Sequence, residues 1–101
     1  MQEQKVKQLP LIWRGSAKLF AALGDEHRQR ILLMCRRRVE IRLQDVFAVL
    51  PLSRTAIAHH VGVLRDAQLL IAEKRGGEVY LQINTSALGR AAKVALQLGL
   101  R

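Results

Sequence analysis

Two helical patterns separated by a short turn constrain the fold of this chain more than any other feature. The first is an apolar stripe whose members recur at helical spacing: Leu43, Val46, Phe47 and Leu50. Pro51 cannot continue this helix, because its ring removes the backbone N–H and clashes with the preceding turn. Ser53 is a preferred N-cap residue, so a second helix is expected to begin directly after it. Two helices joined by so short a turn predict a helix-turn-helix.

The second helix of this pair is expected over residues 54–67, and its two sides differ in character. At about 100° per residue, one side gathers Ile57, His60, Val61 and Leu64. The other side carries small or polar groups: Thr55, Ala58, His59, Gly62 and Asp66. A side without bulky apolar groups suits insertion into a groove of DNA. His60, on the apolar side, is expected to be a hydrogen-bonded core residue rather than a ligand.

Two helices are expected before this pair, after a mobile polar arm over residues 1–10. The first is expected from about Leu11, with one inward face: Ile12, Ser16, Leu19, Phe20 and Leu23. Gly24 is suited to end that helix, and Asp25 is a good N-cap for the next one. The next helix is expected over residues 26–37, with three residues inward: Ile31, Leu32 and Cys35.

After the pair, the apolar pattern changes from a helical period to alternation. Residues 70–75 and 78–83 flank Gly76 and Gly77, and a Gly-Gly pair between extended runs indicates a hairpin turn. Residues 85–100 are expected to be helical, with more apolar surface than a small core needs, which indicates a partner subunit. The predicted fold is mainly α with a small β-hairpin, in the order α-α-α-α-β-β-α of a dimeric winged helix-turn-helix. Residues 11–101 are expected to form this one domain.

The charge balance favours a nucleic-acid partner. The chain has 17 Lys and Arg against 8 Asp and Glu, which gives a formal net charge of +9 at pH 7, and so basic a domain attracts polyanions. Only 4% of its residues are aromatic, which argues against a single-strand binder that stacks bases. A lone cysteine excludes an intrachain disulfide and suits a reducing compartment. With no apolar stretch typical of a signal peptide or membrane span, a cytoplasmic protein without a membrane partner is expected.

Four stretches, in order and spacing, resemble motifs of the ArsR/SmtB family of bacterial regulators. Residues 22–32 (ALGDEHRQRIL) are similar to ALGDPxRLxIL, with Glu26 where Pro is common. Residues 52–61 (LSRTAIAHHV) are similar to LSQSxVSHHL, and residues 63–70 (VLRDAQLL) to xLRxAGLV. Residues 73–80 (EKRGGEVY) are similar to the wing motif xRxGxxxY.

The resemblance covers about residues 11–98 and implies a function. It implies a homodimer joined through the first and last helices, near residues 11–23 and 85–100, and an operator that overlaps the promoter of its target genes. We therefore expect a repressor that binds double-stranded DNA sequence-specifically at an inverted repeat.

DNA contacts are expected first from the start of the helix over residues 54–67. Arg54, Thr55 and His59 project there, and an arginine can pair with guanine O6 and N7 through two hydrogen bonds. Ser53 begins this helix and is included in the expected contact set. Ala58 stands where the family usually has Ser, so its methyl group is placed to touch a thymine instead of making a polar contact.

Further contacts are expected from the hairpin and from the end of the same helix. Lys74 and Arg75 precede the hairpin tip and are placed to reach phosphates or an adjacent minor groove. Glu78 stands where a basic residue is frequent in the family, and its carboxylate is expected to weaken the contribution of the wing. Arg65 is expected either to contact the DNA backbone or to form a salt bridge with a neighbouring carboxylate.

Many relatives release DNA when they bind a metal, and neither of two such sites is expected here. Arg42 and Gln44 stand at the positions of a Cys-x-Cys pair, and a guanidinium has no lone pair for a metal. Residues 84–101, where a second site type has Asp, His and Glu, contain none of these residues and no Cys. The chain is therefore expected to hold no metal and no other cofactor.

Two alternatives remain open. Cys35 is expected to be a buried, inert thiol, but with His27 and a partner-chain residue it could form a non-classical metal- or thiol-responsive site. A winged helix can also serve as a protein-interaction module. Neither an enzyme nor a catalytic residue is expected, because no Gly-rich phosphate loop, paired carboxylates or triad-like set is present.

Overall fold

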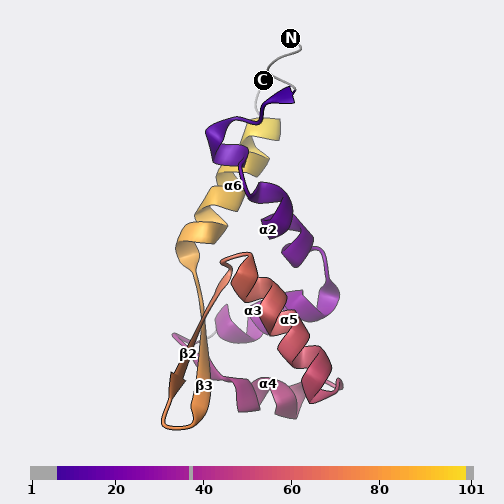
Figure 1. Cartoon of the computed structure of the whole chain (residues 1–101), viewed down its shortest axis with the longest axis vertical. Coiled ribbons are helices and arrows are strands. Elements are labelled where there is room, and N and C mark those ends of the chain that lie inside the picture. The colour runs from indigo at the N-terminus through magenta and orange to yellow at the C-terminus, as the bar shows by residue number, and fades with distance from the viewer. Residues whose placement is uncertain (1–6, 37, 100–101) are drawn as a thin grey trace.

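The computed structural model describes residues 7–36 and 38–99, and these residues form a winged helix-turn-helix (Figure 1). The elements follow one another as η1 (Leu11–Trp13), a short 3₁₀ helix, α2 (Ser16–Leu23), α3 (Glu26–Arg36), β1 (Ile41–Arg42), α4 (Leu43–Val49), α5 (Arg54–Asp66), β2 (Leu70–Arg75), β3 (Glu78–Ile83) and α6 (Thr85–Gly99). Figure 1 shows α2 and α6 together at one end of an elongated molecule, and α4 and the β2–β3 hairpin at the other. The main plan of the predicted fold is confirmed.

Some predicted features lie outside the described residues. They are residues 1–6 of the predicted arm and two predicted helix ends, Arg37 and Leu100. Residues 7–10 are exposed. None of the helices in the described part of the chain combines the length and apolar character that a membrane span requires.

The predicted helix-turn-helix is formed by α4 and α5. The hydroxyl oxygen of Ser53 accepts a hydrogen bond from the backbone N–H of Ala56 at 3.1 Å, which fixes the start of α5. The buried side of α5 consists of Ile57, Val61 and Leu64, as its apolar pattern predicts. After α5, Gln68 takes a φ of 62°, which turns the chain toward β2.

The wing is a three-stranded antiparallel sheet rather than the predicted two-stranded hairpin. β2 and β3 pair through the expected turn, where Gly76 and Gly77 have φ values of 57° and 82°. β1 pairs with the other edge of β3, in the strand order β1-β3-β2, with Ile41 opposite Leu81. A strand of two residues is too short to show an alternating pattern, so the sequence did not reveal β1.

The predicted continuous helix from Leu11 is wrong. Gly15 has a left-handed φ of 80° and separates η1 from α2. The helical register restarts after this residue, so the inward face changes: Leu19 and Ala22 are buried, whereas Phe20, predicted to lie inward, is 40% exposed. In α3 the prediction is confirmed, because Ile31 and Cys35 are buried and Leu32 is partly buried.

The last helix supplies both core and exposed apolar side chains. Ala87, Ala91 and Val94 of α6 are buried against the domain. Leu96 and Leu98 are 59% and 74% exposed. The sequence predicted more apolar surface on this helix than the core needs. Part of that surface is exposed in the single chain.

Candidate nucleic-acid interface

Five residues at the start of α5 lie exposed together, and we call them the contact face: Ser53, Arg54, Thr55, Ala58 and His59. They face solvent because the opposite side of the helix packs against the core. The contact face presents a guanidinium, two hydroxyls, a methyl group and an imidazole. These are groups that can contact phosphates and base edges.

The side chain of Arg54 is positioned by an aromatic ring of the preceding helix. Its Cζ lies 5.0 Å from the centroid of the Phe47 ring on α4, which is a cation–π contact across the turn. The contact with the ring uses none of the guanidinium N–H groups in a hydrogen bond to another residue of the described chain, so they remain able to donate. The Ser53 hydroxyl accepts from the helix backbone, so its own proton remains available to a phosphate.

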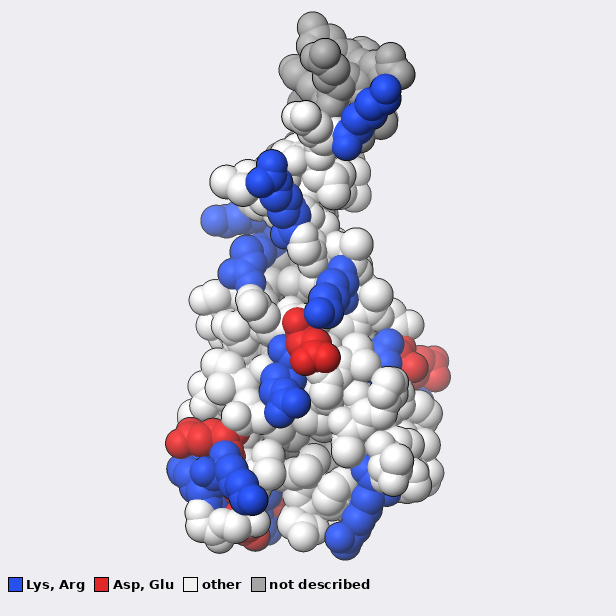
Figure 2. Space-filling model, in the orientation of Figure 1, with Lys and Arg blue, Asp and Glu red and all other residues white. Residues whose placement is uncertain are grey.

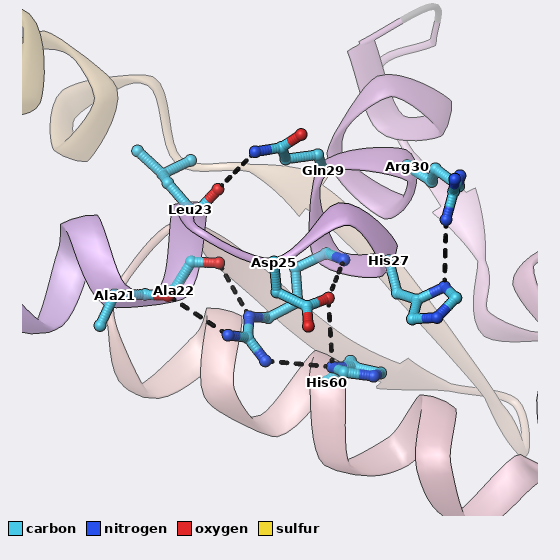
Figure 3. A network of polar contacts seen from close by, with 9 residues as sticks. Ala21, Ala22, Leu23, Asp25, His27, Gln29, Arg30 and His60 are labelled. Atoms are coloured by element: carbon cyan, nitrogen blue, oxygen red, sulfur yellow. Dashed lines mark hydrogen bonds and ion pairs between the residues drawn. The ribbon is translucent and has the colours of Figure 1, made fainter.

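His60 lies behind the contact face, between α5 and the start of α3 (Figure 3). Its side chain is 14% exposed, and its Nδ1 accepts a hydrogen bond from Nη1 of Arg28 at 3.1 Å. Arginine can only donate, so Nδ1 carries no proton and the neutral ring is protonated at Nε2. Asp25 Oδ1 lies 3.9 Å from the same nitrogen. His60 is therefore a largely buried, hydrogen-bonded residue, as predicted.

Arg28 connects His60 to the end of α2. Its Nε donates to the carbonyl oxygen of Ala22 at 2.8 Å, and its Nη2 donates to that of Ala21 at 3.2 Å. The guanidinium thus adds donors to carbonyls in the last turn of α2, of which that of Ala21 also accepts from the backbone N–H of Gly24 at 3.2 Å. The backbone N–H of Arg28 donates to Asp25 Oδ1 at 3.1 Å, which caps α3 as predicted. One residue thus links α2, α3 and α5.

The pKa of His60 lies below its ordinary value, chiefly because burial disfavours the charged ring. The positive charge of Arg28 acts in the same direction, and the carboxylate of Asp25 opposes it. Two more histidines adjoin the ring, with centroids at 5.6 Å for His27 and 5.8 Å for His59, and both also lower the pKa. His60 therefore adds no charge beside the contact face at pH 7.

Arg75, at the end of β2, is already bound by carboxylates of this chain. Its Nη2 donates to Glu40 Oε1 at 2.5 Å, its Nε lies 3.8 Å from Glu73 Oε1, and its Cζ lies 4.0 Å from the centroid of the Tyr80 ring. The hydrogen bond to Glu40 is the main reason why the pKa of Arg75 is raised. A DNA phosphate would have to compete with Glu40 for the same N–H groups, so the structure weakens the case for this predicted contact.

Lys74 is the more available cation of the wing. It is exposed, and its ammonium forms no ion pair within residues 7–36 and 38–99. Glu78, expected to repel phosphate, accepts hydrogen bonds from Arg42 Nη1 at 3.4 Å and from the Tyr80 hydroxyl at 3.2 Å. Part of its charge is thus offset within the fold.

The remaining predicted contact, Arg65, lies exposed near the end of α5. Of its two predicted roles, the salt bridge is absent from the part of the chain that the structure describes.

Figure 2 shows acidic and basic side chains mixed at the wing tip, whereas the charged side chains over α6 and the start of α2 on the same face are basic.

Three residues that shape this interface received no role from the sequence: Arg28, Glu40 and Phe47. Arg28 lies in the first motif and Phe47 in the first apolar stripe, but neither pattern says which atoms meet. No sequence pattern indicated a role for Glu40, because its partner Arg75 is 35 residues away along the chain.

Comparisons with known proteins test the resemblance. The arsenical resistance operon repressor of Escherichia coli is 31% identical over 77 residues, which are 76% of this chain and 66% of that repressor. The transcriptional repressor SdpR of Bacillus subtilis is 26% identical over 70 residues, 69% of this chain and 77% of SdpR. The solved structure of an ArsR-like transcriptional regulator from a Rhodococcus species is 31% identical, with a TM-score of 0.78 over 86% of this chain and 79% of that one. The chain belongs to the ArsR family of transcriptional regulators.

Membership of the ArsR family confirms the predicted resemblance. No protein-family model matches the chain, and the chain spans just under two thirds of the length of the Escherichia coli repressor. The assignment of the chain to the family therefore rests on these individual relatives and on the fold that they share with it.

Two residues bear on a metal- or thiol-responsive site, Arg42 and Cys35. Arg42, at one expected thiolate position, binds Asp45 at 3.3 Å and Glu78 at 3.4 Å instead. Cys35 is 2% exposed, and burial raises the pKa of its thiol to about 11, so the thiol stays protonated at pH 7. Within residues 7–36 and 38–99, no group of three His, Cys, Asp or Glu side chains is placed to hold a metal ion.

Proposed function

We propose that this chain is a transcriptional repressor that binds double-stranded DNA sequence-specifically, as a homodimer, at an inverted-repeat operator. The contact face carries the proposal, because it exposes polar and cationic groups together at the start of α5. Recognition helices of helix-turn-helix proteins place their N-terminal residues against base edges in the major groove. The contact face lies at that end of α5.

Positive charge outside the contact face supports the same proposal. The chain carries a formal net charge of +9 at pH 7, and Lys74 and Arg65 are exposed on the wing and at the end of α5. Contacts to phosphates release counterions, so the affinity is expected to fall steeply as salt is raised.

Exposed apolar side chains of η1, α2 and α6 support the homodimer. Leu11, Phe20, Leu96 and Leu98 are 77%, 40%, 59% and 74% exposed. A second copy packed through residues near 11–23 and 85–100 would cover them. Two-fold pairing would then direct both α5 helices to half-sites about one helical turn apart, or a multiple of it, on one side of the duplex.

Selection of bound duplexes from fragmented genomic DNA, followed by footprinting, tests the proposal. The expected footprint covers an imperfect inverted repeat with two symmetric half-sites. Protection no different from that on random DNA would overturn sequence-specific repression. If Arg54→Ala and His59→Ala abolish binding to a protein partner and leave DNA binding intact, the protein-interaction module is the correct function.

The homodimer has its own test in Leu96→Glu. A carboxylate buried in an apolar interface is unfavourable, so this variant is expected to sediment as a monomer where the unmodified protein sediments as a dimer. Leu33→Glu is the matched control, since Leu33 is 50% exposed on α3, outside the proposed interface. Dimers in both variants would contradict the assignment of the interface to α6.

A further inference from the structure

Phe47 lies on the first helix of the helix-turn-helix, outside the contact face, and yet it contacts a residue of that face. Its side chain is partly buried and packs against the hydrophobic core. Such packing restricts the movement of a side chain. The Cζ atom of Arg54 lies over the Phe47 ring, 5.0 Å from its centroid. The ring is therefore a fixed support for one side chain of the proposed DNA-binding surface.

The turn that joins the two helices holds these side chains near each other. Leu50, at the end of α4, is buried in the core, and its carbonyl oxygen accepts a hydrogen bond from the backbone N–H of Leu52 at 2.9 Å. Ser53 then caps the start of α5. The backbone between Phe47 and Arg54 is thus anchored at both ends. Whether the ring meets the guanidinium depends mainly on the rotamer of Arg54.

The guanidinium of Arg54 has no other partner that would hold it elsewhere. Within residues 7–36 and 38–99 it forms no hydrogen bond or ion pair, so the contact with Phe47 is the interaction that orients its charge. An unrestrained arginine side chain samples many rotamers and loses this freedom when it binds. The ring restricts the rotamers of Arg54 before DNA is present.

This restriction matters more for a base than for a phosphate. An arginine can reach a phosphate from many directions, and such a contact carries no sequence information directly. Pairing with guanine O6 and N7 takes two hydrogen bonds at once, which requires the guanidinium in one place and one plane. An ordered Arg54 therefore favours the base contact.

We propose that Phe47 is a positioning residue for sequence recognition, which holds Arg54 for a guanine in each half-site and acts through Arg54 rather than through a contact of its own with DNA. The inference rests on the proposed function, because it assigns a cause to the base preference of the same site. A cation–π contact at an exposed site changes an equilibrium by a factor of about two to five, so the ring is expected to contribute about threefold to that preference.

Phe47→Leu tests the proposal, because it removes the ring and keeps an apolar side chain. Fluorescence anisotropy measures the affinity for the operator and for operators substituted at single positions, and each ratio is the base preference at that position. The position read by Arg54 is the one whose preference is lost in Arg54→Gln. Phe47→Leu is expected to lower the preference about threefold at this position and at no other.

Two further variants separate positioning from damage to α4. Phe47→Tyr keeps an aromatic ring and is expected to keep the preference of the unmodified protein. In the Arg54→Gln background there is no guanidinium to hold, so adding Phe47→Leu is expected to weaken operator binding no further. In the unmodified background the same change is expected to weaken it about threefold. A general disturbance of α4 would weaken binding in both backgrounds.

The contact itself is measured without DNA. An aromatic ring shifts the NMR signals of protons that lie over it to lower frequency. The side-chain protons of Arg54 are expected at lower frequency in the unmodified protein and in Phe47→Tyr than in Phe47→Leu. Identical shifts in all three proteins would show that the ring does not hold Arg54 in solution and would overturn the inference.

The binding data can overturn it as well. An unchanged preference in Phe47→Leu, an equal loss at every position, an equal loss in Phe47→Tyr, or an equal loss of operator affinity in both backgrounds would each do so. Specific binding by the unmodified protein together with any of these results refutes the inference alone. If the unmodified protein prefers no duplex over random DNA, the proposed function fails, and the inference fails with it.

Discussion

The start of α5 and the wing both present cations to solvent, but they hold them in different ways. Arg54 rests on the ring of Phe47 and has no carboxylate partner among the described residues, whereas Arg75 is bonded to Glu40. An aromatic ring orients a guanidinium without neutralising it, while a carboxylate also occupies its donors. Ion pairs within the chain therefore decide which basic residues remain available to DNA, and a count of Lys and Arg does not.

The largest effect is expected from Arg54→Gln. Removing a guanidinium that can pair with a base should weaken operator binding by about 1–3 kcal/mol and relax the preference for one base in each half-site. Fluorescence anisotropy with wild-type and single-base-substituted operators measures both effects. Arg36→Gln makes the same charge change at an exposed position in the last turn of α3 and is the control. Equal losses in the two variants would show that net charge, and not α5, governs the affinity.

Lys74→Gln is expected to have the next largest effect. It should weaken binding to operator and to random duplex alike, and it should reduce the slope of log affinity against log salt by about 1 per lysine lost. Titrations at several salt concentrations provide this slope. A change in base preference with an unaltered slope would mean that Lys74 reads bases and does not contact a phosphate.

A smaller effect is expected from Arg75→Gln, because Glu40 already occupies part of this guanidinium. The converse variant, Glu40→Gln, removes the nearer of the two carboxylates that bind Arg75, and it is expected to raise the affinity for random duplex and steepen the salt dependence. Both are measured beside Lys74→Gln in the same titrations. If Arg75→Gln costs as much affinity as Lys74→Gln, the contrast drawn between the two regions is wrong.

The smallest effect concerns stability near pH 6, through the histidine behind α5. The pKa of His60 is lowered in the folded protein from an ordinary value of 6.5, so the unfolded chain takes up the proton first as the pH falls. The contribution of His60 to stability is therefore intact above about pH 7 and is lost as the pH falls below 6.5 toward the lower pKa of the folded protein. Urea unfolding midpoints between pH 7 and pH 5 should fall less in His60→Gln than in the unmodified protein.

His59→Gln is the control for this pH effect, since His59 lies exposed one residue away. It is expected to change the pH dependence only slightly, because His59 is the smallest of the influences on the pKa of His60, and the burial of His60 remains. A pH dependence that is unchanged in His60→Gln, or reduced equally in both variants, would show that burial of His60 is not its source.

Local patterns predicted the helices and the hairpin because the signals lie within a few residues of one another. Ser53 and Pro51 place the turn, and Gly76 and Gly77 supply the positive φ values that the hairpin needs. The split at Gly15 was missed, because an apolar spacing can continue across a residue whose backbone leaves the helix.

The site was predicted less completely than the fold. Exposure of the contact face follows from the helical period, so it was visible in the sequence. Whether Arg75 is available depends on Glu40, and how Arg54 is held depends on Phe47. Such pairings depend on how separate elements pack, and neither residue type nor spacing reveals them.

The junction between β1 and α4 connects the wing directly to the helix-turn-helix. Arg42 ends β1 and directly precedes α4; its backbone N–H donates to Asp45 Oδ2 at 3.0 Å, while its Nη1 reaches Glu78 of β3. No flexible segment separates the wing from the helix-turn-helix here. The wing and the helix-turn-helix are therefore held at one spacing by the fold. In the proposed complex, this spacing would fix the distance between the groove contacts of α5 and the phosphate contacts of the wing. A different operator sequence would then require new side chains on α5 but no change in that spacing.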